Sequence, residues 1–165
     1  TFKLSSEGTT DKVQYALYSL TTEDGTIVYD TSYGSNGKFF SKDSFDFTFY
    51  ASGTYYIRFA IMDTGVSPYV WFNTGLYGIK LVIDDKGYPT VENVVADLKA
   101  QCEKTCTTDY EKAVWFNDWL VENCRYDFSY SYCAPEGALA RGLGTCEAYH
   151  RAYVMLLNSV GIRRS

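Results

Sequence analysis

The chain has 165 residues and a formal net charge of −5, and 46% of its residues are hydrophobic while 21% are charged. This composition is typical of a folded globular protein and excludes an intrinsically disordered chain. The acidic balance argues against nucleic acid or an anionic membrane as the main partner. No run of residues reaches the roughly 18 apolar positions that a membrane span needs.

Residues 1–88 are predicted to form β-strands. Segments rich in Tyr, Phe, Val and Ile alternate or run apolar, with turn sequences such as EDGT at 23–26 and GSNG at 34–37 between them. Short strands at this spacing indicate an antiparallel β-sandwich of the Ig-like type. The aromatic stripes fill its core in this interpretation, and a carbohydrate or protein platform is the alternative. The predicted strands are 13–20, 26–33, 44–51, 54–62, 69–73 and 77–85.

From Gly87 onward, apolar residues recur at the spacing of an α-helix. Thr90 is predicted to cap a first helix, and TDYE at 108–111 has the pattern of a capping box at the start of a second. An irregular aromatic loop, RYDFSYSYCAP at 125–135, follows. A third helix is predicted to begin near Cys146 and to end at Gly161 with a Schellman-type motif.

All the cysteines follow residue 100. If the protein is secreted, four of them can pair and leave one reactive thiol, whereas a cytosolic protein would keep all as reduced thiols. Local pairs between 102 and 106 and between 124 and 133 are sterically possible. The single histidine and the lack of paired CxxC motifs predict neither a metal nor a cofactor. The cysteines are Cys102, Cys106, Cys124, Cys133 and Cys146.

Cys146 has an unusual position, because it follows Gly142, Gly144 and Thr145 while the apolar stripe of the helix begins only after it. With Thr145 as N-cap, Cys146 lies in the first turn, where unpaired amides and the helix dipole stabilise a thiolate. The same amides can hydrogen-bond an oxyanion, and glycines leave room for a substrate. These features predict a nucleophile for acyl transfer. The alternative is a structural cysteine that only begins a helix.

The stretch DYEKAVWFNDWLVENCRYD at 109–127, followed by GALARGLGTCEAYHRAYVMLLNSVGI at 137–162, resembles the transglutaminase-like cysteine-enzyme superfamily. The resemblance covers about residues 89–165 and depends on G-x-G-x-C-x-x-Y followed by LL-x-x-x-GI. It implies an α+β chain, with the β-sandwich over 1–88 and the helical lobe of a papain-like domain over 89–165, truncated after the nucleophile helix. Bacterial proteins of this kind often carry β-sandwich modules before the enzyme domain, which fits residues 1–88. The many Tyr and Phe residues in Ser/Thr/Gly-rich surroundings suit a secreted or cell-surface protein.

By this resemblance Cys146 is the nucleophile that attacks a glutamine side-chain amide or a peptide carbonyl, and an amine or water resolves the thioester. Gly144, Thr145 and Tyr126 are candidates for the oxyanion site and the cleft, although Tyr126 could instead only pack the loop. The superfamily takes its catalytic His and Asp from strands after this helix, so we expect them beyond the sequence given. His150 is not expected to act as the base, because it lies behind the thiol on the same helix.

The sequence therefore predicts the N-terminal portion of a transglutaminase-like acyltransferase or protease with a protein or peptide substrate. We expect no turnover from this portion alone. An uncovered face of the third helix would favour dimerisation or association with a C-terminal segment. A non-catalytic surface or adhesion module that uses the fold as a scaffold is the alternative. A cytosolic redox protein is a further alternative, against which the lack of a CxxC motif argues.

Overall fold

The computed structural model describes residues 1–30, 43–75 and 78–163, and the chain divides into two compact units. The first unit comprises Thr1–Phe49 and Thr54–Val82, and the second comprises Tyr50–Gly53 and Ile83–Ser165. The change of unit near residue 82 lies close to the change of hydrophobic period near Gly87. The sequence-based domains 1–88 and 89–165 remain a prediction.

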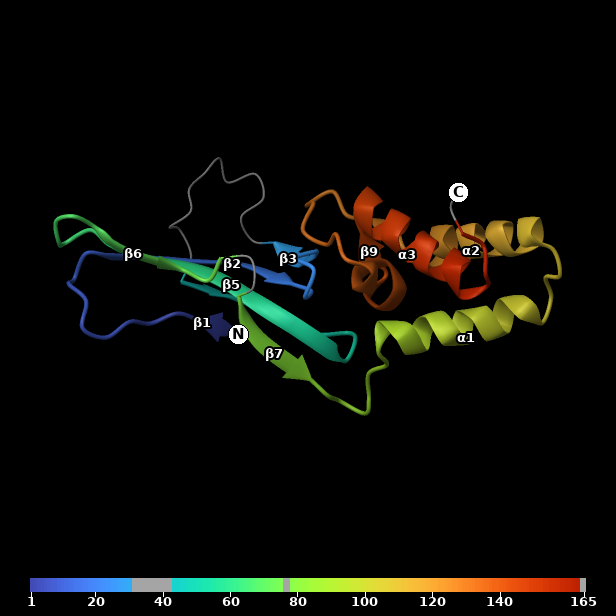
Figure 1. Ribbon diagram of the computed structural model, residues 1–165, viewed down its shortest axis with the longest axis horizontal. Coiled ribbons are helices and arrows are strands. Elements are labelled where there is room, and N and C mark those ends of the chain that lie inside the picture. The colour runs from blue at the N-terminus through green and yellow to red at the C-terminus, as the bar shows by residue number, and fades with distance from the viewer. Residues whose placement is uncertain (31–42, 76–77, 164–165) are drawn as a thin grey trace. The chain divides into compact units, whose positions relative to one another are not determined.

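The first unit is built around two long antiparallel strands, β2 and β5, whose register runs from Val13 opposite Asp63 to Thr21 opposite Tyr56. β3 pairs with β2, and β6 and β7 both pair with β5, which gives a five-stranded sheet (Figure 1). β1 and β4 form a separate antiparallel pair. The predicted antiparallel sheets are thus confirmed. The strands of this unit are β1 (Phe2–Lys3), β2 (Val13–Thr21), β3 (Ile27–Asp30), β4 (Ser44–Phe45), β5 (Gly53–Asp63), β6 (Val70–Asn73) and β7 (Ile79–Ile83).

The predicted strand over 44–51 is wrong beyond its first two residues. Only Ser44–Phe45 pairs with another strand, while Phe47 and Phe49 continue as irregular chain. Their rings pack in the first unit, since Phe47 lies 5.4 Å from Tyr29 between ring centroids. Alternating apolar residues require only an extended chain with one side buried. The alternation at 44–51 therefore reflects the packing of side chains and not hydrogen bonding to a neighbouring strand.

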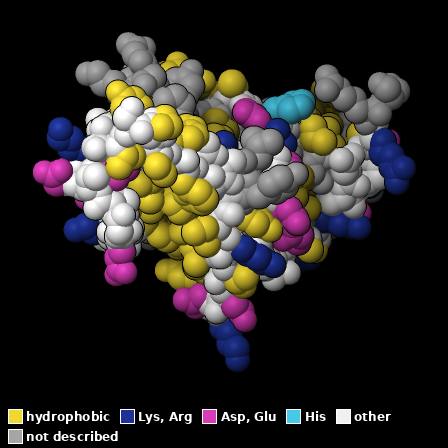
Figure 2. All heavy atoms as spheres, turned by 60° about the vertical axis from the view of Figure 1, so that its left-hand side comes forward, with side chains coloured by type: hydrophobic (Ala, Val, Ile, Leu, Met, Phe, Trp, Pro, Cys, Tyr) yellow, Lys and Arg dark blue, Asp and Glu magenta, His cyan; other side chains and the backbone are white. Residues whose placement is uncertain are grey.

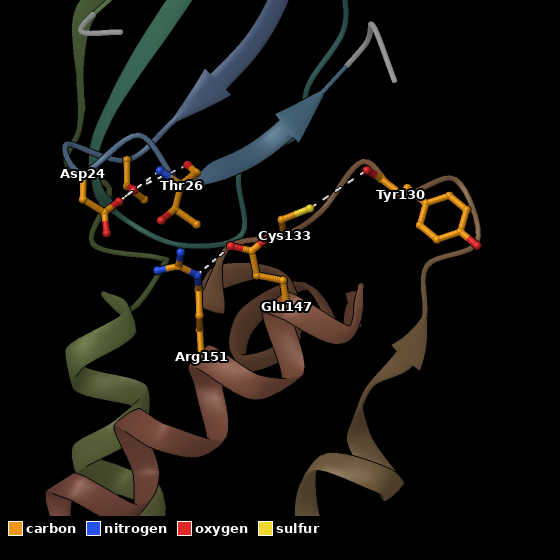
Figure 3. Close-up of polar contacts among 7 residues, drawn as sticks. Asp24, Thr26, Tyr130, Cys133, Glu147 and Arg151 are labelled. Carbon is orange, nitrogen blue, oxygen red and sulfur yellow. Dashed lines mark hydrogen bonds and ion pairs between the residues drawn. The ribbon is translucent and has the colours of Figure 1, made fainter. Parts of the chain in front are cut away.

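The turn predicted at 23–26 is confirmed. The amide of Thr26 donates to Oδ1 of Asp24 at 3.0 Å (Figure 3), and Gly25 adopts a left-handed φ of 83°. The turn predicted at 34–37 lies outside the described residues. So do positions 31–33 of the strand predicted over 26–33 and the first position of the strand predicted over 77–85.

Three helices form the second unit together with a short π-helical segment, η1, and a parallel pair of two-residue strands (Figure 1). Apolar stripes of all three helices and of η1 meet in one core, whose members include Leu98, Phe116, Leu120, Ala152 and Leu156. The elements of this unit are α1 (Val91–Glu103), α2 (Asp109–Asn123), β8 (Arg125–Tyr126), η1 (Gly137–Arg141), β9 (Leu143–Gly144) and α3 (Cys146–Ser159).

The predicted starts of the first two helices are confirmed. The side chain of Thr90 accepts a hydrogen bond from the amide of Asn93 at 3.1 Å. At α2, the Thr108 hydroxyl accepts from the Glu111 amide at 3.2 Å, and the Glu111 carboxylate accepts from the Thr108 amide at 2.9 Å. This reciprocal pair is the capping box that the sequence indicated.

The end of α3 is also confirmed. Gly161 has a φ of 85°, and its amide donates to the carbonyl of Asn158 at 3.1 Å. The amide of Ile162 donates to the carbonyl of Leu157 at 3.0 Å. These two bonds define a Schellman motif, which needs a residue without strain at positive φ in the position of Gly161.

Hydrophobic side chains also gather on the surface, as the face drawn in Figure 2 shows. In the first unit, the exposed large hydrophobic side chains include Val70, Trp71 and Phe72 of β6 and Ile79 and Val82 of β7. Of the helices within the described ranges, none combines the length and the apolar composition that crossing a bilayer requires.

Candidate active site

Cys146 is the first residue of α3, and Thr145 is its N-cap, as the sequence predicted. The side chain of Cys146 is exposed. In the first turn of an α-helix the backbone amides have no acceptor within the helix. An exposed thiol therefore lies beside amide donors that can bind an anion.

The Thr145 side chain does not cap the helix, which differs from the expectation. It is 3% exposed, and its hydroxyl has no hydrogen-bond partner among the described residues. The Thr145 backbone is held instead, because its amide donates to the carbonyl of Tyr132 at 2.9 Å and its carbonyl accepts from the amide of Tyr149 at 3.0 Å. The hydroxyl therefore does not compete for the first-turn amides, which are the donors that an oxyanion on a substrate would need.

Tyr126 reaches the start of α3 through the β8–β9 pair. The two strands are parallel, and Tyr126 is in register with Gly144, two residues before Cys146. The amides of Arg125 and Asp127 donate to the carbonyls of Gly142 and Gly144 at 3.0 and 2.9 Å. The pairing thus brings Tyr126 to the start of α3, although the aromatic loop and η1 separate the two in sequence.

The Tyr126 phenol interacts with both the side chain and the backbone amide of Cys146. Partial burial raises the pKa of the phenol, and its hydrogen bond with the Cys146 thiol raises the pKa further. The phenol is therefore protonated at neutral pH and can donate a hydrogen bond. A thiol, a backbone amide donor and a phenolic donor thus converge here, and groups of these kinds can serve as a nucleophile and as oxyanion donors.

Close packing explains the two glycines before Cys146. A Cβ on Gly144 would lie 2.7 Å from the Cβ of Ala148, closer than two carbon atoms can approach. Gly142 has a φ of 73°, and a Cβ there would lie 3.0 Å from the carbonyl oxygen of Asn123. The glycines thus allow β9 to lie against the first turn of α3 and position Cys146 through the backbone.

Asp127 organises the aromatic loop that follows Tyr126. Its buried carboxylate accepts from the amides of Ser129, Ser131 and Tyr132 at 2.9, 2.8 and 3.0 Å, and also from the Ser129 hydroxyl. Desolvation opposes ionisation, but these hydrogen bonds lower the pKa of Asp127 below its usual value. Tyr130 adopts a left-handed φ of 57° inside this loop. These contacts indicate that Asp127 packs and orders the loop.

Figure 3 also shows two polar contacts, one between Glu147 and Arg151 of α3 and one between Cys133 and Tyr130 of the loop. Glu147 and Arg151 form an ion pair at 2.9 Å, one helical turn apart. The thiol of Cys133 lies 4.0 Å from the carbonyl oxygen of Tyr130. His150 is exposed on the same helix.

The predicted disulfides are absent, because all five cysteines are free thiols. Cys102 is buried in the core, and desolvation together with the neighbouring Cys106 thiol raises the pKa of Cys102 to about 11. Across residues 1–30, 43–75 and 78–163, no three His, Cys, Asp or Glu side chains come together as metal ligands.

Two further residues, Tyr149 and Arg141, make contacts near the site that were not predicted from the sequence. The Tyr149 hydroxyl donates to the carbonyl of Cys124, which joins α3 to the end of α2, and burial raises the pKa of Tyr149. Arg141 of η1 pairs with the buried carboxylate of Glu136 at 3.4 Å. The tyrosine of the C-x-x-Y motif was a usable signal for the contact of Tyr149. The contact of Arg141 depends on a π-helical segment, which has no clear sequence pattern.

One comparison with known proteins gives a match. The profile of the Transglutaminase-like superfamily matches residues 96–163, which include α2, the β8–β9 pair and Cys146. The comparison with curated proteins and the comparison with solved structures gave no significant match. The resemblance seen in the sequence is thus confirmed for this segment. Residues 96–163 belong to the core domain of the transglutaminase-like superfamily.

Proposed function

We propose that this chain is the part of a transglutaminase-like acyltransferase or hydrolase that supplies the nucleophile, Cys146. The observation that carries the proposal is the convergence of the exposed Cys146 thiol, the Cys146 amide and the Tyr126 phenol at the start of α3. A cysteine that only begins a helix needs neither exposure nor a phenolic partner. The match over residues 96–163 supports the same assignment.

The first step forms a thioester. The Cys146 thiolate adds to the carbonyl carbon of a glutamine side-chain amide or of a peptide bond, and the negative charge moves to the carbonyl oxygen. The Tyr126 hydroxyl and the first-turn amides hydrogen-bond that oxygen. When the intermediate collapses, the carbon–nitrogen bond breaks, and the nitrogen takes a proton and leaves as ammonia or an amine. General acid catalysis of this kind typically contributes about 100- to 10,000-fold.

The second step resolves the thioester. An amine or water attacks the carbonyl carbon, loses a proton and expels the Cys146 thiolate, which regenerates the nucleophile. An amine gives transamidation, and water gives hydrolysis. The resemblance implies that a histidine oriented by an aspartate handles the protons, and we propose that these come from strands that follow α3 rather than from His150. Thr145 and Gly144 then position the nucleophile through the backbone.

Peptide mapping tests the nucleophile directly. Limiting iodoacetamide at about neutral pH should label Cys146 before the four other cysteines, and Cys146→Ala should abolish that early label. Amine incorporation into a glutamine donor and casein hydrolysis, each with Cys146→Ala as control, then separate transferase from protease. Earlier labelling of Cys106 or Cys133, the partly exposed thiols, would count against the assignment.

A second candidate function is binding without catalysis, in a surface or adhesion module. It is favoured by β6, where Val70, Trp71 and Phe72 are all exposed. Exposed hydrophobic groups of this size often mark interaction sites. A Cys146 thiol that reacts no faster than the other exposed thiols would favour this candidate over the enzyme.

We further propose that the N-terminal sheets are one Ig-like β-sandwich and that the protein is bacterial and secreted or attached to the cell surface. Ring contacts within the first unit support the sandwich, since Phe45 beside β1 lies 5.5 Å from Tyr29 of the larger sheet. A Phe45→Ala variant should then lose about 3–5 kcal/mol of stability, the usual cost of removing a buried phenylalanine. A loss below about 1 kcal/mol would contradict two packed sheets.

A further inference from the structure

Tyr126, which contacts Cys146, is one of three exposed aromatic side chains in this loop, and the other two have no assigned role. Tyr126, Phe128 and Tyr130 form an aromatic cluster, in which the Tyr126 ring makes edge contacts with Phe128 and Tyr130 at centroid distances of 5.0 and 6.4 Å. Phe128 is 81% exposed, although a phenylalanine gains free energy from burial. A ring left so exposed contributes little to the fold itself.

The backbone beneath the aromatic cluster is held in one conformation. The Asp127 carboxylate accepts hydrogen bonds from the amides of Ser129, Ser131 and Tyr132, as described above. The Thr145 amide donates to the carbonyl of Tyr132, which ties the end of the loop to the start of α3. A ligand that binds the cluster therefore loses little free energy to ordering the loop.

The aromatic cluster offers apolar contact and no exposed charge of its own. The segment 126–132 reads YDFSYSY, and its only charged side chain, Asp127, is buried and occupied by loop amides. The cluster begins at Tyr126, whose phenol meets the Cys146 thiol, and continues outward to Phe128. Whatever acyl group reaches Cys146 thus has an apolar aromatic surface beside it.

We propose that the aromatic cluster is a specificity subsite, which binds an aromatic or large apolar side chain next to the reactive carbonyl of the acyl donor. The proposal rests on the proposed function, because it takes Cys146 as the nucleophile. Phe128 and Tyr130 supply the binding surface, and Tyr126 joins that surface to the reacting group. Acyl donors with an acidic residue at this position should react more slowly, because their carboxylate would lose hydration without gaining a partner on the aromatic rings.

Two small electrophiles test the subsite without any need for turnover. In both reagents the Cys146 thiolate displaces chloride from the carbon beside the amide carbonyl, but N-benzyl chloroacetamide carries an aromatic ring on the other side of that carbonyl and N-methyl chloroacetamide lacks it. The rate of Cys146 alkylation by each is followed by mass spectrometry, and the benzyl-to-methyl ratio is divided by the same ratio for free cysteine. We expect the normalised ratio to exceed one, and Phe128→Ser to lower it roughly two- to tenfold, which corresponds to one aromatic contact.

Tyr110→Ser is the matched control, because Tyr110 is 79% exposed but lies on α2 outside the cluster. It should leave the ratio unchanged, and Tyr130→Ser should lower it. A ratio near one in the wild type, or a ratio that Phe128→Ser and Tyr130→Ser both leave unchanged, would overturn the subsite while Cys146 still reacts. Failure of Cys146 to react ahead of the other cysteines with iodoacetamide would instead overturn the proposed function. Far-UV circular dichroism checks that each variant is folded.

Discussion

At the scale of single residues, the proposed mechanism gives Tyr126 the most specific role, which is to donate a hydrogen bond to the oxyanion. A phenol that donates to an oxyanion matters only when a carbonyl is attacked, because alkylation by iodoacetamide forms no oxyanion. The two reactions of one thiol therefore report on different properties. Acylation reports on oxyanion binding, and alkylation reports on the nucleophile itself.

We predict that Tyr126→Phe slows acylation of Cys146 by p-nitrophenyl acetate about 100-fold, at the lower end of what losing one oxyanion donor costs. Alkylation by iodoacetamide should change by less than about threefold. The release of p-nitrophenolate in a single turnover measures the first rate, and mass spectrometry measures the second. Tyr130→Phe removes a phenol from the same loop and serves as control. Equal slowing of both reactions would mean that Tyr126 acts on the thiol and not on the carbonyl.

Gly144 gives a second prediction at this scale. Gly144→Ala should destabilise the fold by about 1–3 kcal/mol, because its new methyl group would overlap the Cβ of Ala148. Chemical denaturation measures the loss. Adding Ala148→Gly removes the obstructing atom, so the double variant should lose less than the two single variants together. Strict additivity of the two losses would contradict a direct clash.

At the scale of elements, the capping box of α2 makes stability depend on pH. The amides of Thr108 and Thr107 and their hydroxyls hydrogen-bond the Glu111 carboxylate and lower its pKa to about 2. Because the pKa is lowered in the folded state, the carboxylate stabilises the fold above its ordinary pKa of 4.5. That stabilisation is lost as the pH falls from about 4.5 toward about 2.

We therefore predict that the free-energy difference between the wild type and Glu111→Gln shrinks as the pH is lowered from about 6 to about 3. Urea denaturation at a series of pH values measures it. Glu122→Gln, a replacement near the other end of the same helix, is the control and should show no such trend. A difference that stays constant over this range would mean that the box does not depend on the charge of Glu111.

Elements whose determinants are local could be predicted from the sequence. The caps at Thr90 and Thr108 and the end at Gly161 depend on residues within one turn of each other, and all three are confirmed. β8 and β9 could not be predicted, because two-residue strands have no period and pair only when α2 and α3 bring them together. The missing cap bond at Thr145 has a similar cause, since tertiary packing buries the hydroxyl.

The same distinction holds for the candidate site. The position of Cys146 in the first turn of α3 could be predicted from the glycines, the N-cap residue and the helix pattern, because those signals are contiguous in sequence. The contact of Tyr126 with Cys146 depends on the β8–β9 register, so the sequence left its role open. The role of Asp127 in ordering the loop had a local signal in the D-x-S sequence. An aspartate carboxylate commonly accepts a hydrogen bond from the amide two residues ahead, as Asp127 does from Ser129.

At the scale of the whole molecule, the second unit takes a short segment from the first half of the sequence. Ser52 donates its amide to the carbonyl of Pro89 at 3.0 Å, and its hydroxyl accepts from the amide of Asp85 at 3.0 Å. The Arg141 guanidinium of η1 lies between two rings of this unit, 4.7 Å from the Tyr50 centroid and 4.6 Å from the Tyr132 centroid. Residues 50–53 thus group with the second unit, although the rest of that unit begins only at Ile83.

We predict that Tyr50→Ser in the full chain loosens the second unit and not the first. The ring contact with Arg141 is partly desolvated, so its loss should cost about 1 kcal/mol, which corresponds to roughly fivefold faster hydrogen exchange. Peptides from η1 and the first turns of α3 should exchange faster, because Arg141 also holds the buried Glu136 carboxylate. Peptides from β2 should exchange at the wild-type rate.

Tyr88→Ser is a closely matched control, because Tyr50 and Tyr88 are both 43% exposed and both lie in the second unit. Only Tyr50 has its ring on Arg141. Mass spectrometry of peptides after timed exchange separates the two variants. If both substitutions accelerate η1 equally, exposure of a tyrosine at the surface explains the effect and the ring contact does not. If Tyr50→Ser accelerates β2 as much as η1, residues 50–53 stabilise the chain as one cooperative body, and the division into two units does not describe how it unfolds.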